Sequence, residues 1–108
     1  MPRLMVLWTR PYHLSASEAD EWSCREAARA LEWDGVTRAE LVRLRSASTQ
    51  QASPWDWMLE LQLRDGIDAS ACIESPACAR WLGDLRLLGM RPAVVLAERS
   101  STLPEASS

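Results

Sequence analysis

Hydrophobic residues along the chain follow two different spacings, which predict strands and helices. Short apolar runs at residues 4–8 and 92–97 have the length of strands in a core, the first one buried on both faces. The second run begins with Pro92, whose missing amide is tolerated at a sheet edge. Residues 36–45 alternate imperfectly and residues 55–63 alternate strictly, with a period of two. These segments predict four strands.

A first helix is predicted between the first two strands. It begins near Ala16, because Ser15 and Glu18 form a capping box, and it ends before Gly35, which supplies the left-handed residue of a helix end. Apolar residues fall on two faces of this helix. We expect the stripe of small residues to lie on the sheet, namely Cys24, Ala27, Ala28 and Leu31. The opposite face then carries Ala19, Trp22, Ala30 and Trp33.

The second helical region is predicted to be broken. Asp68 or Ser70 can cap a short helical turn, and Ser75 followed by Pro76 marks a new helix start. The longer helix then runs to Gly89, which sits where a C-terminal cap belongs. Its apolar stripe consists of Cys78, Trp81, Leu82, Leu85 and Leu88.

The resulting element order is βαββαβ in one α+β domain of residues 1–99. This order predicts a four-stranded antiparallel sheet that carries both helices on one face. Residues 100–108 are mostly serine, threonine, proline and charged residues, which cannot bury enough surface to offset their ordering entropy, so they are expected to be disordered. The uncovered sheet face needs a partner, because several apolar side chains are predicted to lie there. These are Met5, Leu7, Met58 and Val95.

Charge and composition exclude several kinds of partner. The net charge is −3, so the chain lacks the basic excess with which proteins neutralise nucleic-acid phosphates. No apolar run approaches the ~20 residues of a membrane-spanning helix, and no signal-peptide cleavage site follows the first apolar run. We therefore expect a cytoplasmic protein with neither a nucleic-acid nor a membrane partner.

Three cysteines and one histidine do not form a metal-binding pattern. Cys24, Cys72 and Cys78 contain no CxxC pair, and cysteines at apolar helix positions usually act as small hydrophobic residues. The ligand spacing of a zinc or iron-sulfur site is missing. No metal site is predicted.

His13 and the aromatic side chains are the candidates for chemistry. Histidine is the usual side chain for moving protons near neutral pH, so His13 could have this role, or it could simply pack beside the first helix. Five aromatic residues could line a pocket for a flat ligand, although core packing explains most of them equally well; they are Trp8, Tyr12, Trp55, Trp57 and Trp81. Trp8 and Trp57 are favoured because the first and third strands are expected to be neighbours.

Arginines in the second strand offer a further candidate. Arg43 could bind a ligand carboxylate, but salt bridges of Arg43 and Arg45 with Asp56 and Glu60, across the hairpin or a dimer, are the simpler expectation. The chain contains no glycine-rich phosphate loop, GxSxG or HExxH motif. Nucleotide binding and the common hydrolase mechanisms are therefore not predicted.

Three segments resemble the dimeric α-β barrel superfamily, a ferredoxin-like group that includes the EthD family and the antibiotic biosynthesis monooxygenases. They are the first strand with the following Arg-Pro-Tyr-His loop, the Gly-Val start of the second strand, and the broken second helix ending in Leu-Gly-Met-Arg-Pro. The resemblance covers residues 3–99. It implies a homodimer in which two sheets pack face to face, with a pocket for aromatic or polyketide-like molecules.

Two hypotheses of function follow. The first is a cofactor-independent enzyme of the monooxygenase, isomerase or cyclase type, with His13 as the proton carrier. The alternative is a noncatalytic dimeric domain that binds a small hydrophobic or aromatic ligand or a protein, with the helix face bearing Trp22 and Trp33 as the candidate surface. A closed cavity with His13 beside Trp8 or Trp57 would favour the first hypothesis, and a filled interior would favour the second.

Overall fold

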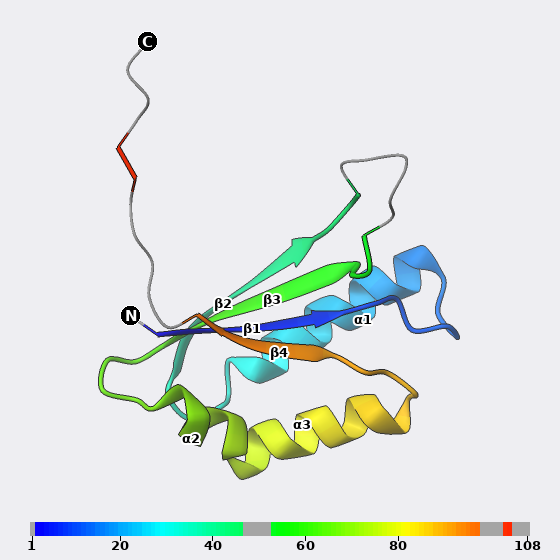
Figure 1. Ribbon diagram of the computed structural model, residues 1–108. Helices are drawn as coiled ribbons and strands as arrows, with labels where there is room; N and C mark the ends of the chain where they lie inside the picture. The colour runs from blue at the N-terminus through cyan, green and yellow to red at the C-terminus, as the bar shows by residue number, and fades with distance from the viewer. Residues whose placement is uncertain (1, 47–52, 98–102, 105–108) are drawn as a thin grey trace.

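The computed structural model describes residues 2–46, 53–97 and 103–104, and it confirms the predicted α+β element order. Figure 1 shows the sheet with the helices on one of its faces. The residues predicted as a disordered tail lie outside the described part, apart from 103–104, as do residues 47–52 of the predicted hairpin loop. The elements are β1 (Arg3–Trp8), α1 (Ala16–Ala30), β2 (Val36–Arg43), β3 (Trp57–Leu63), α2 (Ala69–Glu74), α3 (Pro76–Leu87) and β4 (Ala93–Ala97).

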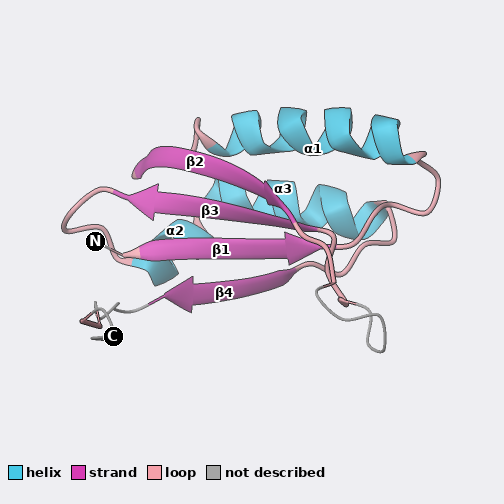
Figure 2. Cartoon of the chain, turned by 90° about the horizontal axis from the view of Figure 1, so that it is seen from above, coloured by secondary structure: helices cyan, strands magenta, loops and turns pink. Residues whose placement is uncertain are grey.

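The sheet is fully antiparallel, with strand order β2-β3-β1-β4. The predicted neighbours β1 and β3 are paired, and β4 lies at the edge, where Pro92 is tolerated. Because neighbouring strands run in opposite directions, β1 and β2 finish at the same end of the sheet at which β3 and β4 begin (Figure 2). Four loops or strand ends therefore meet at one end of the molecule.

The core lies between the sheet and the helices. The strict alternation of β3 is confirmed, since every second residue of this strand is buried against the helices. β1 contributes in the same way, and side chains from both strands are at most 3% exposed. They are Leu4, Val6 and Trp8 from β1 and Trp57, Leu59, Leu61 and Leu63 from β3.

The predicted orientation of α1 is wrong. The helix buries Ala19, Ser23, Ala27 and Ala30, whereas Cys24 and Ala28 are exposed and Leu31 is 49% exposed. The reason is size: Trp22 and Trp33 offer much more apolar area than cysteine and alanine, so turning them inward removes more surface from water. Trp33 is 5% exposed and packs against Trp81, with ring centroids 5.3 Å apart. The face proposed for a partner is thus part of the core.

The broken second helical region is confirmed. Asp68 caps α2 by accepting the backbone N–H of Ser70. Ser75 has extended backbone, ends α2, and caps α3 by accepting the N–H of Cys78. Gly89 follows α3 with a φ of +79°, a conformation that favours glycine.

The second sheet face is uncovered in the single chain. β1 was predicted to be buried on both faces, but Met5 and Leu7 are only half-buried, because they point away from the helices. On the same face, Leu7 pairs with Met58, Met58 pairs in turn with Val42, and Val95 is 43% exposed. In the described part, no helix is long and apolar enough to span a membrane.

Candidate ligand-binding site

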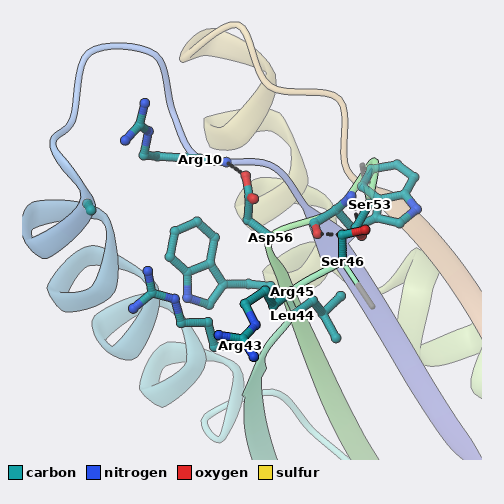
Figure 3. Close-up of a pocket in the computed structure, with 10 residues that line it drawn as sticks. Arg10, Arg43, Leu44, Arg45, Ser46, Ser53 and Asp56 are labelled. Atoms are coloured by element: carbon teal, nitrogen blue, oxygen red, sulfur yellow. Dashed lines mark hydrogen bonds between the residues drawn. The ribbon is translucent and has the colours of Figure 1, made fainter. Parts of the chain in front are cut away.

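An open pocket of about 760 Å³ lies at the end of the sheet where β1 and β2 finish and β3 begins (Figure 3). Its arginines come from the loop after β1 and from the end of β2. We call it the arginine–tryptophan pocket. The described residues that line it are Arg10, Ala16, Arg43, Leu44, Arg45, Ser46, Ser53, Trp55, Asp56 and Trp57.

Asp56 ties together the three segments that form this pocket. Its backbone N–H donates to the carbonyl of Trp8 at 2.9 Å, and its own carbonyl accepts the N–H of Leu44 at 2.8 Å. One carboxylate oxygen, Oδ2, accepts the backbone N–H of Arg10 at 2.7 Å. The residue before β3 therefore fixes the ends of β1 and β2 relative to each other.

The pocket has an excess of positive charge. Three guanidinium groups line it, against the single carboxylate of Asp56. Arg43 pairs with Asp20 of α1 at 3.0 Å, while the side chains of Arg10 and Arg45 have no ion pair within the described part of the chain. Guanidinium groups without a partner are available for an anionic ligand.

The salt bridges predicted across the β2–β3 hairpin are not formed among the residues that the structure describes. Glu60 pairs with Arg3 of β1 at 2.8 Å, and Asp56 binds a backbone amide. The register explains both contacts: Arg43 lies opposite Trp57 on the helix face, whereas Glu60 points to the uncovered face. Arg43 therefore reaches α1 rather than β3.

The structure brings three of the predicted site residues together, because Trp55 lines the arginine–tryptophan pocket along with Arg43 and Trp57. Arg43 and Trp57 are directly paired across β2 and β3, and both line the arginine–tryptophan pocket. Trp57 is 3% exposed, so most of its indole belongs to the core.

Tyr12 and His13 lie elsewhere. Both are exposed and line a pocket of about 380 Å³ with Leu87, Leu88 and Gly89, and their rings are 5.5 Å apart. Trp8 is 1% exposed and donates its indole N–H to Ser23, inside the core. The structure therefore does not place His13 in a pocket with Trp8 or Trp57.

Four tryptophans fill the space between the sheet and the helices. Ring centroids of Trp8 lie 6.2 Å from Trp22 and 6.0 Å from Trp81, and Trp81 contacts Trp33, all edge to face. Trp81 is 1% exposed, and its indole N–H donates to the Glu26 carboxylate at 2.7 Å. The interior on this side is packed with side chains.

Cysteine and metal chemistry find no support in the described residues. No group of three or more His, Cys, Asp or Glu side chains in this part of the chain could hold a metal ion. Burial raises the pKa of the Cys72 thiol, and burial together with nearby Cys72 raises the pKa of Cys78 to about 11. These thiols stay neutral and are poor nucleophiles. Cys24, predicted at an apolar position, is exposed.

Sequence reasoning missed Arg10, Arg45 and Asp56 as site residues. Arg10 lies in the loop after the first strand, and Arg45 and Asp56 were assigned to predicted strands as salt-bridge partners. The usable signal was topological, because βαββαβ order brings the ends of β1 and β2 beside the start of β3.

Three solved structures illustrate what the fold is similar to. An EthD family protein from Bacillus halodurans has a TM-score of 0.68 at 17% identity, covering 93% of this chain and 99% of the other. SnoaB, a cofactor-independent oxygenase from Streptomyces nogalater solved as a variant, has a TM-score of 0.61 at 20% identity, covering 96% and 97%. A dimeric ferredoxin-like protein of unknown function from Thermobifida fusca has a TM-score of 0.59 at 10% identity, covering 89% and 88%.

No protein-family model and no curated protein matches the sequence. At these low identities, the similarity to solved structures concerns the fold alone. It agrees with the sheet order and with the helices packed on one sheet face. The chain therefore has the ferredoxin-like α+β fold found in EthD proteins, antibiotic biosynthesis monooxygenases and other dimeric α-β barrel proteins.

Proposed function

We propose that this protein is a homodimer in which each copy binds a small aromatic anion in the arginine–tryptophan pocket. The observation that carries the proposal is the presence of Arg10 and Arg45, two guanidinium groups without an ion pair among the described residues, beside Trp55 in one pocket. We further propose that the protein works in the cytoplasm.

The chemistry of the lining defines the ligand class. A guanidinium group binds a carboxylate through two parallel hydrogen bonds and also stacks on aromatic rings. Indole rings such as that of half-buried Trp55 supply a flat apolar surface. The volume of about 760 Å³ falls within the range of small-molecule sites. These features favour a planar ligand with a carboxylate, sulfonate or phenolate group.

The uncovered sheet face supports the homodimer. Its centre is apolar, since Leu7 lies opposite Met58 on one side and Ala93 on the other. An uncovered apolar area of this kind usually meets a partner. A second copy is a fitting partner, because the protein of the same fold from Thermobifida fusca is described as dimeric.

The packed interior favours binding without catalysis. The tryptophans occupy the space between sheet and helices, and His13 lies outside the arginine–tryptophan pocket. A general acid or base must lie within hydrogen-bonding reach of the proton it transfers. The guanidinium groups of the pocket are suited to binding an anion.

A cofactor-independent enzyme is the second candidate. It is favoured by the fold similarity to SnoaB, a cofactor-independent oxygenase, and by the placement of His13 in a pocket beside Tyr12. If this second candidate is right, His13→Ala abolishes turnover of a substrate and leaves its binding unchanged. Unchanged turnover in this variant removes the role of His13.

Isothermal titration with biphenyl carboxylate and the neutral biphenyl carboxamide tests the primary proposal. We expect the acid to bind about tenfold more tightly, because a charge-assisted hydrogen bond contributes roughly 1.5–3 kcal/mol. Arg45→Gln should remove this preference, and Arg64→Gln, an exposed arginine outside the pocket, should keep it. Equal affinities for acid and amide in the wild-type protein would contradict the proposal.

A further inference from the structure

We infer that the ligand is an elongated aromatic dianion, whose second anionic group is held by Arg86 and Arg91 at the far end of a groove. This inference rests on the proposed function and extends it, because it assigns a second anion subsite in the same molecule. Three adjoining hollows along one end of the sheet carry the argument.

The second subsite is a pocket of about 380 Å³ between the end of α3 and the start of β4. Its lining is Arg86, Gly89, Met90, Arg91 and Pro92, which includes two guanidinium groups and no carboxylate. Neither arginine has an ion pair within the described ranges. Here, as in the arginine–tryptophan pocket, positive charge faces a hollow.

Arg91 is the stronger of the two anion-binding candidates. Arg86 lies in the last turn of α3, where a cation also compensates the negative end of the helix dipole. Arg91 belongs to the short link between Gly89 and β4, outside any helix, so it has no such structural role. Its exposed side chain and its place in the pocket lining make it available to a ligand.

An apolar groove connects the two subsites. A third hollow of about 420 Å³ shares Arg10 and Trp55 with the arginine–tryptophan pocket, and it shares Gly89, Met90 and Arg91 with the second subsite. Between these shared ends it is lined mainly by apolar and aromatic residues. They are Pro11, Tyr12, Pro54 and Leu88, with Thr9 as the polar exception.

This arrangement follows from the strand order. The loop after β1 and the residues before β3 lie between the end of β2 and the start of β4 in the order β2-β3-β1-β4. Arg45 and Arg91 therefore belong to opposite sides of the same sheet end, and between them lie Trp55, just before β3, and Tyr12, in the loop after β1. A ligand that reaches both arginines must be long, flat and apolar in the middle, with an acid group at each end.

Isothermal titration calorimetry with the full chain can measure how much the second subsite contributes to affinity. The probes are biphenyl carboxylate, with one acid group, and biphenyl dicarboxylate, with an acid group at each end. We expect the dicarboxylate to bind about tenfold more tightly, which exceeds the twofold gain from its two equivalent orientations. Arg91→Gln should lower the affinity for the dicarboxylate to about twice that for the monocarboxylate, which is the gain from its two orientations, and leave the monocarboxylate affinity within twofold of the wild-type value.

A matched control is Arg80→Gln, which removes an exposed arginine of α3 outside these three hollows. It should preserve the preference for the dicarboxylate, and both variants should keep the wild-type melting temperature. If neither acid binds, the proposed function itself fails. The second subsite for an aromatic dianion is overturned if the dicarboxylate binds no more than twofold more tightly than the monocarboxylate. It is also overturned if an acidic hexaglutamate peptide binds through Arg91 while the dicarboxylate does not bind.

Discussion

The indole N–H of Trp8 donates to the hydroxyl oxygen of Ser23 at 3.2 Å, and both side chains are at most 1% exposed. Trp8 ends β1 and Ser23 lies in the middle of α1, so this bond joins the sheet to the helix that covers it. Ser23 is the buried polar residue among the described ones. Its hydroxyl satisfies a donor that would otherwise be unpaired in the core.

Replacing Ser23 by alanine tests this contact. Ser23→Ala leaves the Trp8 indole N–H buried without an acceptor, which costs roughly 1–3 kcal/mol of unfolding free energy. Urea denaturation measures the loss, with Cys24→Ala as the control on the exposed side of the same helix. The account of this contact is wrong if both variants are equally stable.

The helix cap of α1 should make the stability of the protein depend on pH in the acid range. Backbone and side-chain hydrogen bonds with Ser15 lower the pKa of the exposed Glu18 below its ordinary value of 4.5. A lowered pKa in the folded state contributes stability above the unfolded pKa, and this contribution is lost as the pH falls through the folded pKa. Ser15→Ala should cost about 1 kcal/mol at neutral pH and return the Glu18 pKa toward its ordinary value. A carboxyl NMR titration in which Glu18 is unaffected would speak against the capping box.

The buried thiol of Cys78 should make the stability of the protein depend on pH in the alkaline range. Its pKa rises from 9.0 to about 11 on folding, mainly because burial disfavours the thiolate. The neutral thiol therefore contributes stability below pH 9, and this contribution is lost as the pH rises toward 11. The stability advantage of wild type over Cys78→Ala should shrink in this window when both are unfolded in urea. A difference that stays constant with pH would refute the assignment.

Thiol labelling at a single pH checks which cysteines are buried. The exposed Cys24 should react with a maleimide in the folded protein, and buried Cys72 and Cys78 only after unfolding.

The proposed dimer can be broken at the centre of the uncovered sheet face. Leu7→Glu would bury an unpaired charge between two apolar sheets, so sedimentation equilibrium should find a monomer of about 12.1 kDa, where the wild type has twice that mass. Leu87→Glu is the control, since Leu87 is 87% exposed on α3, on the helix side of the molecule. A wild-type monomer at micromolar concentration, or a Leu7→Glu variant that remains dimeric, is incompatible with pairing through this face.

Local patterns predicted the strands but not the orientation of α1. In β3, hydrophobic residues occupy one side and mostly polar residues the other, so the buried face was unambiguous. In α1, one apolar face carries Cys24 and Leu31 and the other carries Trp22 and Trp33. Helical spacing alone cannot rank two such faces. The choice depends on how the large indoles pack against Trp8 and Trp81, which come from distant parts of the chain.

The candidate site was predicted only in part, because its remaining residues are also brought together by contacts between distant parts of the chain. Arg43 and Trp57 were singled out from the sequence and do meet in the arginine–tryptophan pocket. Arg10 enters the same pocket because its backbone N–H is held by Asp56, forty-six positions away. A contact of such long range depends on sheet register, which no local pattern specifies.

The proposed ligand occupies the arginine–tryptophan pocket at the sheet end and not the interior between sheet and helices. Indole N–H signals of the six tryptophans can be followed by NMR while biphenyl carboxylate is added, with Trp55→Phe used for assignment. We predict that the Trp55 signal moves and that those of Trp8 and Trp81, whose N–H groups are bonded to Ser23 and Glu26, stay in place. Large shifts of Trp8 and Trp81 with an unmoved Trp55 would contradict the account.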